Sequence, residues 1–373
     1  MALTRLTSAN AIPDDSVANV KMANIVQSKN IIINGDMSVA QRGTSTSSVS
    51  SGSTYVVDRT FVYVTNGGTW TMSQDTAVPS GSGFAKSIKL DCTTADASLG
   101  AADYIAMQQR IEGQNLQYIK KGTSSAESLT LSFWVYATKT GTNICELYDA
   151  DNTRQISKSY TVDTTNTWEK KTITFAGDTS GTLDNDNATS MTLLFWLGAG
   201  SNFTSGTLNT SWASATTANR AVGQVNHADS TSNNFYITGI QLEAGDTASE
   251  FEFLPYDVNL QRCYRYYEMM ADGRQDADAI IALGFVYQTN VISLAYQWHP
   301  KRSTPSISQS SGTNYFRYQR DGGTEDFDSI KIYIPNANTG LIYSDDNFTG
   351  TDDENGWAQI NNAAAYVALS AEL

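Results

Sequence analysis

The feature that most constrains this chain of 373 residues is a long succession of short apolar runs, each separated from the next by Gly, Ser, Thr, Asn and Asp. Such runs predict strands, and their close spacing predicts packed antiparallel sheets instead of alternating strands and helices. Up to Asp257 the predicted strands are Ile31–Ile33, Tyr55–Val64, Gly68–Met72, Ala85–Asp91, Tyr104–Ile111, Ser128–Ala137, Ile144–Tyr148, Ser157–Val162, Glu169–Phe175, Thr189–Leu197 and Asn234–Leu242.

The last apolar run of this region, from Phe235 to Leu242, predicts a buried strand that is broken by Gly245-Asp246. Its expected partner is the early strand Ile31–Ile33, which ends at the turn-forming pair Asn34-Gly35. We therefore expect the chain between these two strands to close into one large β-sandwich over residues 30–257. The only helix signal of note within it is Glu112–Lys121, one or two turns long.

Residues 258–373 repeat the β pattern on a smaller scale and predict a second, smaller β-sandwich. The junction, Asp257–Met270, has a helix-compatible apolar spacing, and two interpretations stay open, a helix or the first strand of the second unit. The strands predicted after it are Ala279–Tyr287, Val291–Tyr296, Ser306–Gln309, Asn314–Tyr318, Ile330–Ile334, Gly340–Tyr343 and Ala363–Leu369.

Residues 1–29 differ from the rest because their apolar residues have a mixed spacing that suits neither a long helix nor a clean strand. A segment this short cannot form a core alone. We expect a short extended N-terminal attachment arm that packs on another protein, and a frayed terminus is the alternative. The candidate anchoring residues are Val17, Val20, Met22 and Ile25.

The charge balance narrows the class of partner. The formal net charge is −14 with a pI near 4.5, so nucleic acid and anionic membrane surfaces are not expected partners. No apolar run approaches the roughly 18–20 residues of a membrane-spanning helix, so we expect no membrane insertion. The three cysteines are far apart and have no C-x-x-C spacing, which favours buried free thiols over disulfides or a zinc site.

Four segments, NIIINGDMSVAQRG, YVVDRT, LTLSFWVYATK and FYITGIQLEAGDTASEFEFLPYD, occur in this order between Asn30 and Asp257. Together they resemble the carbohydrate-binding-module-like jelly rolls of tailed-bacteriophage fibre and other virion proteins. The resemblance implies an all-β jelly-roll sandwich, a place on the virion as a tail fibre or on the capsid surface, and assembly as a homotrimer. It also implies that other phage structural proteins bind residues 1–29 and that the ligand is a host-surface glycan.

The same resemblance raises the question of a metal. Related modules hold a structural calcium between the first-strand turn and an acidic pair in the last strand. Asp36 matches the first position, but Thr238-Gly239 stands where the acidic pair is usual. Elsewhere, Asp184-x-Asp186 begins like a calcium loop but continues with Ala188 at the third ligand position. We therefore expect no metal and no other cofactor.

Catalytic signatures are weak in this sequence. His227 lies in a polar loop, His299 precedes Pro300, and neither has a hydrolase or metalloprotease motif around it. Carboxylate pairs lie in Gly-, Asn- and Thr-rich loops, which is typical of solvated turns. We expect no catalytic residue and no enzyme activity, although a glycosidase with two carboxylates stays open as an alternative.

Sugar binding is the chemistry that the sequence favours. Strand alternation puts Trp134 and Tyr136 on the reverse of one core-facing strand and Trp196 on the reverse of another. If that reverse face is open, these rings form a platform for pyranose C–H faces, and if it is covered they are core residues. Trp212, in a polar loop, is the fourth candidate ligand-binding residue.

These observations predict a non-enzymatic virion protein, a tail fibre or spike that binds a host-surface glycan. A capsid decoration or head-fibre protein is one alternative, and a glycan depolymerase is the other. The segment MALTRLTSANAIPDD has no apolar signal-peptide core, so we expect synthesis in the host cytoplasm before assembly.

Overall fold

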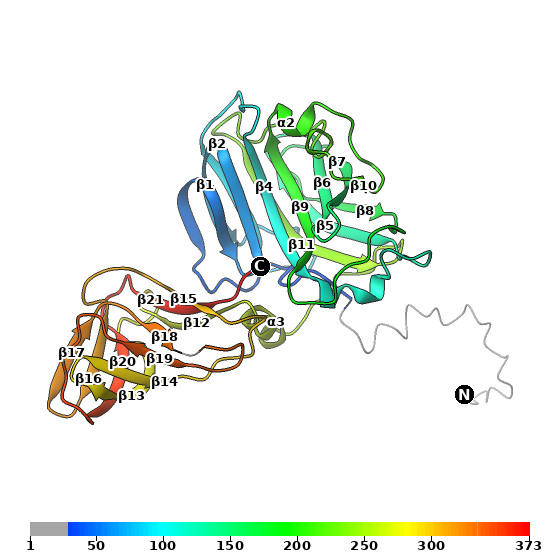
Figure 1. Cartoon of the computed structure of the whole chain (residues 1–373). Coiled ribbons are helices and arrows are strands. Elements are labelled where there is room, and N and C mark those ends of the chain that lie inside the picture. Colours follow the sequence, from blue (N-terminus) through cyan, green and yellow to red (C-terminus); the bar gives the residue numbers. More distant parts are fainter. Residues whose placement is uncertain (1–28, 334) are drawn as a thin grey trace, which may run out of the picture.

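The computed structural model describes residues 29–333 and 335–373, and this part of the chain is nearly all β. A large curled unit and a smaller β unit lie next to each other, with a short helix at their junction (Figure 1). The expected anchoring residues Val17, Val20, Met22 and Ile25 lie outside the described residues. Among the described residues, none of the helices is long and apolar enough to cross a membrane.

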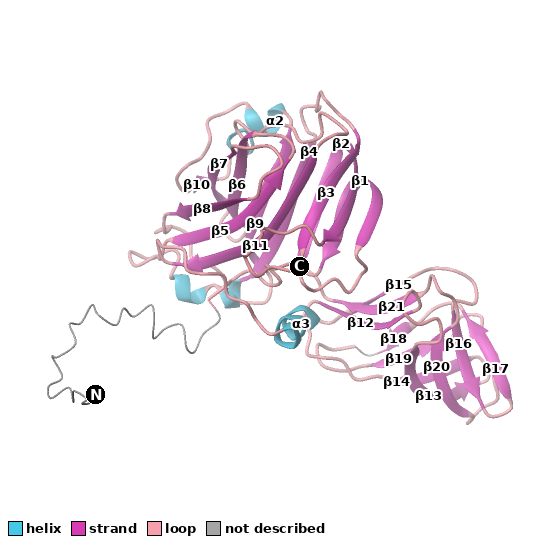
Figure 2. Ribbon diagram, turned by 180° about the vertical axis from the view of Figure 1, so that it is seen from behind, coloured by secondary structure: helices cyan, strands magenta, loops and turns pink. Residues whose placement is uncertain are grey.

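The larger unit is built on one eleven-stranded sheet in the order β10-β7-β6-β9-β4-β2-β3-β11-β5-β8, with β1 paired to β2. The sheet curls so that its inner faces meet, as the views from both sides show (Figure 2). Across the core, the ring of Phe133 on β5 packs edge-on against those of Phe195 on β9 and Tyr160 on β7, both with centroids 5.0 Å away. The expected jelly-roll β-sandwich is therefore confirmed.

The larger unit contains eleven strands and four short helical turns among the described residues. Its strands are β1 (Ser45–Val57), β2 (Thr60–Asp75), β3 (Ser87–Thr94), β4 (Tyr104–Glu112), β5 (Leu129–Ala137), β6 (Gly141–Asp149), β7 (Arg154–Val162), β8 (Glu169–Phe175), β9 (Thr189–Ala199), β10 (Ala213–Ser214) and β11 (Asn234–Ala244). Its helical turns are η1 (Gly113–Asn115), η2 (Gln117–Ile119), α2 (Ser201–Thr204) and η3 (Thr217–Asn219), and the first two occupy the stretch expected to form one or two turns.

The expected strand Ile31–Ile33 is a turn, although its place beside the last strand is correct. The Ile31 N–H donates to the Leu242 carbonyl at 2.9 Å, and the Ile240 N–H donates to the Gly35 carbonyl at 2.9 Å. The side chain of Asn30 takes over the rest of the ladder, because its amide donates to the Ile240 carbonyl and its oxygen accepts the Leu242 N–H. The side-chain amide of Asn30 thus makes two hydrogen bonds to β11 that the backbone of a neighbouring strand would otherwise make.

The expected strand Tyr55–Val64 is a hairpin. Its turn is Asp58-Arg59, and Arg59 adopts a positive φ of 71°. Both turn residues are buried and each has polar partners: Asp58 accepts from Gln41 and Arg59 donates to Glu372. The following strand, β2, is longer than expected and takes in the separate strand predicted at Gly68–Met72.

The smaller unit begins with α3 (Tyr256–Tyr264), so the junction is a helix followed at once by a strand, and each interpretation of Asp257–Met270 holds for part of it. A three-stranded sheet, β12-β21-β15, covers one face of a seven-stranded sheet, β17-β16-β20-β13-β14-β19-β18. The strands are β12 (Tyr267–Asp272), β13 (Ile280–Gln288), β14 (Val291–Ala295), β15 (Ser306–Gln309), β16 (Phe316–Arg320), β17 (Gly323–Phe327), β18 (Lys331–Tyr333), β19 (Leu341–Ser344), β20 (Asn355–Ile360) and β21 (Tyr366–Ser370).

This arrangement confirms a second, smaller β-sandwich. The sequence did not predict β17 or β20 as separate strands, and it offered β12 only as one of two interpretations of the junction. The exact domain limits 30–257 and 258–373 stay a prediction, because α3 and the residues around it contact both units.

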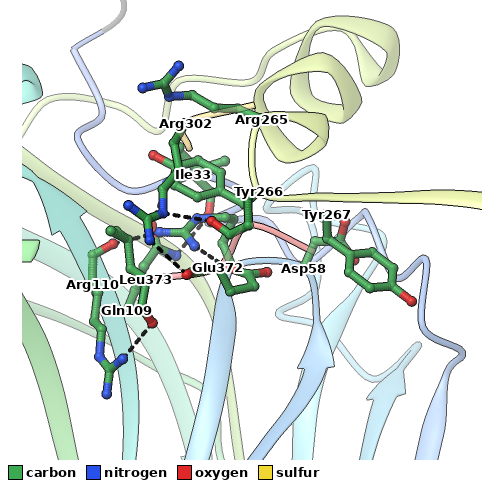
Figure 3. Close-up of polar contacts among 12 residues, drawn as sticks. Ile33, Asp58, Gln109, Arg110, Arg265, Tyr266, Tyr267, Arg302, Glu372 and Leu373 are labelled. Carbon is green, nitrogen blue, oxygen red and sulfur yellow. Dashed lines mark hydrogen bonds and ion pairs between the residues drawn. The ribbon is translucent and has the colours of Figure 1, made fainter. Parts of the chain in front are cut away.

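Arginines from both units converge on the final residues of the chain (Figure 3). Glu372 accepts from Arg42 at 3.1 Å and from Arg59, while Arg110 donates to the Leu373 carbonyl. From the smaller unit, Arg302 donates to the carbonyls of residues 371 and 372 at 2.6 and 3.1 Å. These contacts fix the smaller unit against the end of the larger one.

Candidate functional site

The outer face of β5 carries two of the predicted ligand-binding residues. Because Phe133 and Val135 point into the core, Trp134 and Tyr136 point outward, and both are half-buried. Trp134 lies between Thr238 on β11 and Lys170 on β8, and Tyr136 lies beside Tyr236. The alternation in this strand therefore placed its outward residues correctly.

Trp134 lines a groove of about 410 Å³. Ser132 and Gly239 line it as well, and two loops, around residues 81–84 and 250–253, form its sides. The side chains at its edge are polar and of both signs, with Lys170 on β8 and Glu250 on the second loop, both exposed. The groove thus combines an aromatic floor with hydrogen-bonding groups.

Three phenylalanines form the wall of this groove. The ring of Phe84 lies 4.9 Å from that of Phe251 and 5.0 Å from that of Phe253, and the last two rings are 4.9 Å apart. Phe84 is buried at 8% exposure, whereas Phe253 is 51% exposed and offers its ring to solvent. Mutual packing of three rings holds the exposed one in place without a ligand.

Gly239 allows this wall to sit against β11. It has a φ of +63°, and a Cβ at this position would lie 2.4 Å from the ring of Phe84. Only glycine meets both conditions, because other residues are strained at this φ and the ring cannot come so close to a Cβ. Gly239 therefore serves the groove wall by letting the Phe84 ring lie against β11.

An aromatic shelf, made of Tyr136, Trp168 and Tyr236, continues the outer face beyond Trp134. The ring of Tyr136 lies 5.0 Å from that of Tyr236 and 5.7 Å from that of Trp168. The Lys89 ammonium lies 5.8 Å from the Tyr236 ring centre and 3.6 Å from the Asp91 carboxylate. Since alternate residues of a strand are about 7 Å apart, groove and shelf can contact consecutive units of one extended ligand.

The prediction that Trp196 joins this platform is wrong. Phe133 and Phe195 face each other across the core, so the outward faces of β5 and β9 point in opposite directions. Trp196 is also only 1% exposed, because Phe203 and the segment around Ala221 cover its side of β9.

A buried carboxylate, Glu146, fixes the Trp196 ring there. The Trp196 indole N–H donates to Glu146 at 3.0 Å, and the Arg220 guanidinium donates to the same carboxylate at 2.9 Å. Burial raises the pKa of Glu146, and the nearby Arg220 charge opposes that effect. This indole therefore belongs to a buried polar network.

Trp212 lies at the far end of β8 and is not among the residues that line the groove. Its indole N–H donates to the Ala176 carbonyl at 2.8 Å, and the Lys121 ammonium lies 5.1 Å from the ring centre. The ring also packs on the main core, so it closes an edge of the sandwich.

The histidines have structural surroundings. His227 is fully buried and shares a 2.7 Å hydrogen bond with Asn143, and burial lowers its pKa to about 4. His299 stacks on Tyr264 at 4.4 Å, and its Nδ1 lies 3.0 Å from Glu268. Neither histidine is among the residues that line the groove.

Carboxylates suspected as pairs or metal ligands have partners nearby. Asp326 pairs with Arg317 at 2.6 Å, and Glu354 pairs with Arg320 at 2.5 Å. Asp36 accepts hydrogen bonds from the Asn259 amide and from the Ser38 hydroxyl, at 3.1 Å each. Across residues 29–333 and 335–373, no group of three or more His, Cys, Asp or Glu is placed to hold a metal ion.

Sequence reasoning missed the groove wall and the shelf residue Trp168. The alternation of Phe251 and Phe253 was visible, but it indicated only a strand exit. Phe84 lay in a Gly- and Ser-rich turn, and nothing in the sequence brings residues 84, 168 and 251 together. Contacts between loops bring Phe84 to Phe251, and Trp168, just before β8, packs on Tyr136 and Tyr236.

No protein-family model matches the chain, and no curated protein matches it. Among solved structures, the enzymatically active domain of tailspike protein 4 of bacteriophage CBA120 is 15% identical, covers 58% of this chain and 21% of its own, and gives a TM-score of 0.29. A family 11 carbohydrate-binding module of Clostridium thermocellum, in complex with a β-1,3-1,4-mixed-linked tetrasaccharide, is 12% identical. The match covers 55% of this chain and 99% of the module, with a TM-score of 0.28. The module TmCBM61, in complex with β-1,4-galactotriose, is 11% identical. The match covers 58% of this chain and 99% of the module, with a TM-score of 0.29.

The match to the tailspike domain spans about a fifth of that protein's length. At these TM-scores the similarities do not identify a function. The chemistry of the groove has to be inferred from this chain's own residues.

Proposed function

We propose that this protein is a non-enzymatic component of a phage virion that binds a host-surface glycan through the groove and the aromatic shelf. The observation that carries the proposal is the half-buried Trp134 on the floor of an open groove whose wall presents the exposed ring of Phe253. Rings held in this way suit the C–H faces of a pyranose, and the flanking Lys170, Glu250 and Ser132 can hydrogen-bond its hydroxyls.

The size and shape of the groove fit such a ligand. Its volume of about 410 Å³ lies within the range of roughly 300–1,000 Å³ of small-molecule sites. With few polar groups and an open side, one groove would bind weakly. Several copies on one particle would raise the effective concentration without any new contact.

Absence of catalysis is part of the proposal and is supported by the lining of the groove. Glu250 is the only carboxylate among the residues that line it, whereas most glycosidases use two carboxyl groups roughly 5–10 Å apart. The virion setting has a different support, the four sequence segments that resemble phage fibre jelly rolls. A tail fibre and a capsid decoration protein differ only in location, which imaging of the particle would distinguish.

A glycan array comparing the wild type with two groove variants tests the proposal. We expect Trp134→Ala and Phe253→Ala each to weaken binding by about tenfold or more, because each removes a stacking ring. Tyr118→Ala is the matched control, since Tyr118 is 45% exposed and lies outside the groove lining.

Two results would contradict the proposal. One is a wild-type protein that binds no glycan, or groove variants that bind as the wild type does. The other is the release of new reducing ends from host-surface polysaccharide incubated with the protein, which would make it an enzyme.

A further inference from the structure

A second surface stands out in the smaller β unit, on the outer face of its seven-stranded sheet. Large apolar side chains remain uncovered there by the residues that the structure describes. We name this surface the apolar face, and its members with their exposed fractions are Ile280 62%, Leu283 66%, Phe285 41%, Tyr287 60%, Tyr333 57%, Leu341 40% and Trp357 39%.

The strand register shows that these side chains form one continuous surface. Leu283 on β13 pairs with Trp357 on β20 and with Ala295 on β14, and Leu341 on β19 pairs with Tyr333 on β18. Along β13, the rings of Phe285 and Tyr287 are 6.4 Å apart. The row therefore crosses the middle of the sheet from β20 to β18.

The opposite face of the same strands is already occupied. Val286, Leu294 and Ile342 are fully buried there in a core shared with Val367 and Leu369 of the three-stranded sheet. The apolar face thus points away from the core of this unit and, among the described residues, contributes no contacts to it. Burying the apolar face requires another molecule or another segment of the chain.

The area of the apolar face matches a protein interface. Large apolar side chains present roughly 150–250 Å² each when fully exposed, so the fractions above leave about 700 Å² open. The largest apolar patch on a typical monomer is about 300–600 Å², and a standard interface buries about 800 Å² on each partner. One face of this size is enough for a stable pair.

Charge distribution favours a second copy of the same chain. On the central strands β13, β14, β19 and β20, the outward residues of this face are uncharged, whereas the chain carries −14 overall. Charged side chains flank the face in pairs of opposite sign, Arg317 with Asp326 on one side and Lys331 with Asp345 on the other. A neutral centre with a mixed polar rim lets two strongly acidic copies meet without bringing like charges together.

The aliphatic members of the face argue against a sugar, although four of its seven members are aromatic. Leu283 is its most exposed member, and Ile280 follows it. Branched aliphatic side chains offer neither a flat ring for stacking nor a group that can hydrogen-bond a hydroxyl. We propose that the apolar face is a self-association surface, at which a second copy of this chain packs with the same face, giving a pair of chains where the sequence resemblance implies a homotrimer.

Light-scattering mass measured across a dilution series tests this inference on the full chain. We expect the wild type to be larger than one chain and to dissociate on dilution. Leu283→Glu and Tyr287→Glu should each weaken the association by roughly 100-fold, because each would bury a carboxylate in an apolar contact. Both side chains are at least 60% exposed in one copy, so at dilutions where the wild type is a single chain these changes should leave its melting temperature unaltered.

Tyr256→Glu is the matched control. Tyr256 is 58% exposed, close to the 60% of Tyr287, but it lies on α3 away from this sheet, so its replacement should leave the mass unchanged. Amide hydrogen exchange gives a second readout, in which residues 280–288 should lose protection on dilution.

A wild type that is a single chain at every concentration would overturn the inference. So would Leu283→Glu and Tyr287→Glu proteins that keep the wild-type mass, because residues 1–28 or another surface would then hold the copies together. Glycan binding by isolated copies involves Trp134 on the other unit, so failure of the two proposals can be told apart.

Discussion

Trp134 and Trp196 carry the same side chain at the same place in the alternation of their strands, yet their surroundings are opposite. The outer face of β5 is open at Trp134, whereas the outer face of β9 is closed over Trp196 by residues 201–221. What separates an exposed platform from a second core is therefore the loop that crosses it. A strand pattern alone cannot show that loop.

This contrast gives a prediction about stability. Trp196→Ala should lower the free energy of unfolding by about 3–5 kcal/mol, since it leaves a large cavity and removes the indole donor of the buried Glu146. Trp134→Ala should cost much less, because its ring is only half-buried. Urea unfolding of the two variants measures the difference, and equal losses would show that Trp134 is a core residue after all.

His227 gives a prediction about pH. Burial lowers its pKa from the ordinary 6.5 to about 4, so between these values the unfolded chain binds a proton that the folded chain does not. The contribution of His227 to stability is complete above about pH 6.5 and is lost as the pH falls toward 4, by about 3 kcal/mol in total. Urea unfolding from pH 7 to pH 4 should show this loss in the wild type relative to His227→Gln. Parallel pH profiles of the two proteins would contradict it.

At the scale of elements, sequence patterns found most strands but not their limits. The break between β1 and β2 was missed because its turn, Asp58-Arg59, contains no Gly, Asn or Pro, although Arg59 adopts a positive φ. The Ile31–Ile33 run has high β-propensity, yet the side chain of Asn30 took over the ladder and left a turn. Half of the candidate site was predictable in the same way: alternation placed Trp134 and Tyr136, while the phenylalanine wall depends on contacts between distant loops.

The join between β11 and the groove wall can be tested at Gly239. Gly239→Ala should weaken glycan binding severalfold and lower stability by about 1–3 kcal/mol, because a Cβ would displace the Phe84 ring. Gly52→Ala is the matched control, since Gly52 has a similar φ of +76° but nothing within 4 Å of its Cβ position. Calorimetry and glycan titration would separate the cost of backbone strain, common to both variants, from the cost of the clash. Equal effects of the two substitutions on binding would count against the proposed wall.

At the scale of the whole molecule, the two β units are tied by charges that are nearly buried. Arg59 is 2% exposed and belongs to the larger unit, and its guanidinium lies 3.4 Å from the ring centre of Tyr266, which follows α3. Glu372, at the end of the smaller unit, supplies its counter-charge. If the larger unit holds a glycan and the smaller one makes a contact, as proposed, one connected body would carry both.

Glu372→Ala should loosen that connection. It leaves the Arg59 guanidinium buried without its carboxylate, and removing one partner of a buried ion pair costs about 3–5 kcal/mol. Glu127→Ala is the matched control, because its pair with Lys120 is exposed at 41% and 54% and should contribute no more than about 1 kcal/mol. We expect small-angle scattering to show a larger radius of gyration for Glu372→Ala, and proteolysis to cut first near residues 254–266. If scattering and digestion match those of the Glu127→Ala protein, then the apolar contact of Ile33 and Val39 with Cys263 and Tyr266, and not the ion pair, holds the units together.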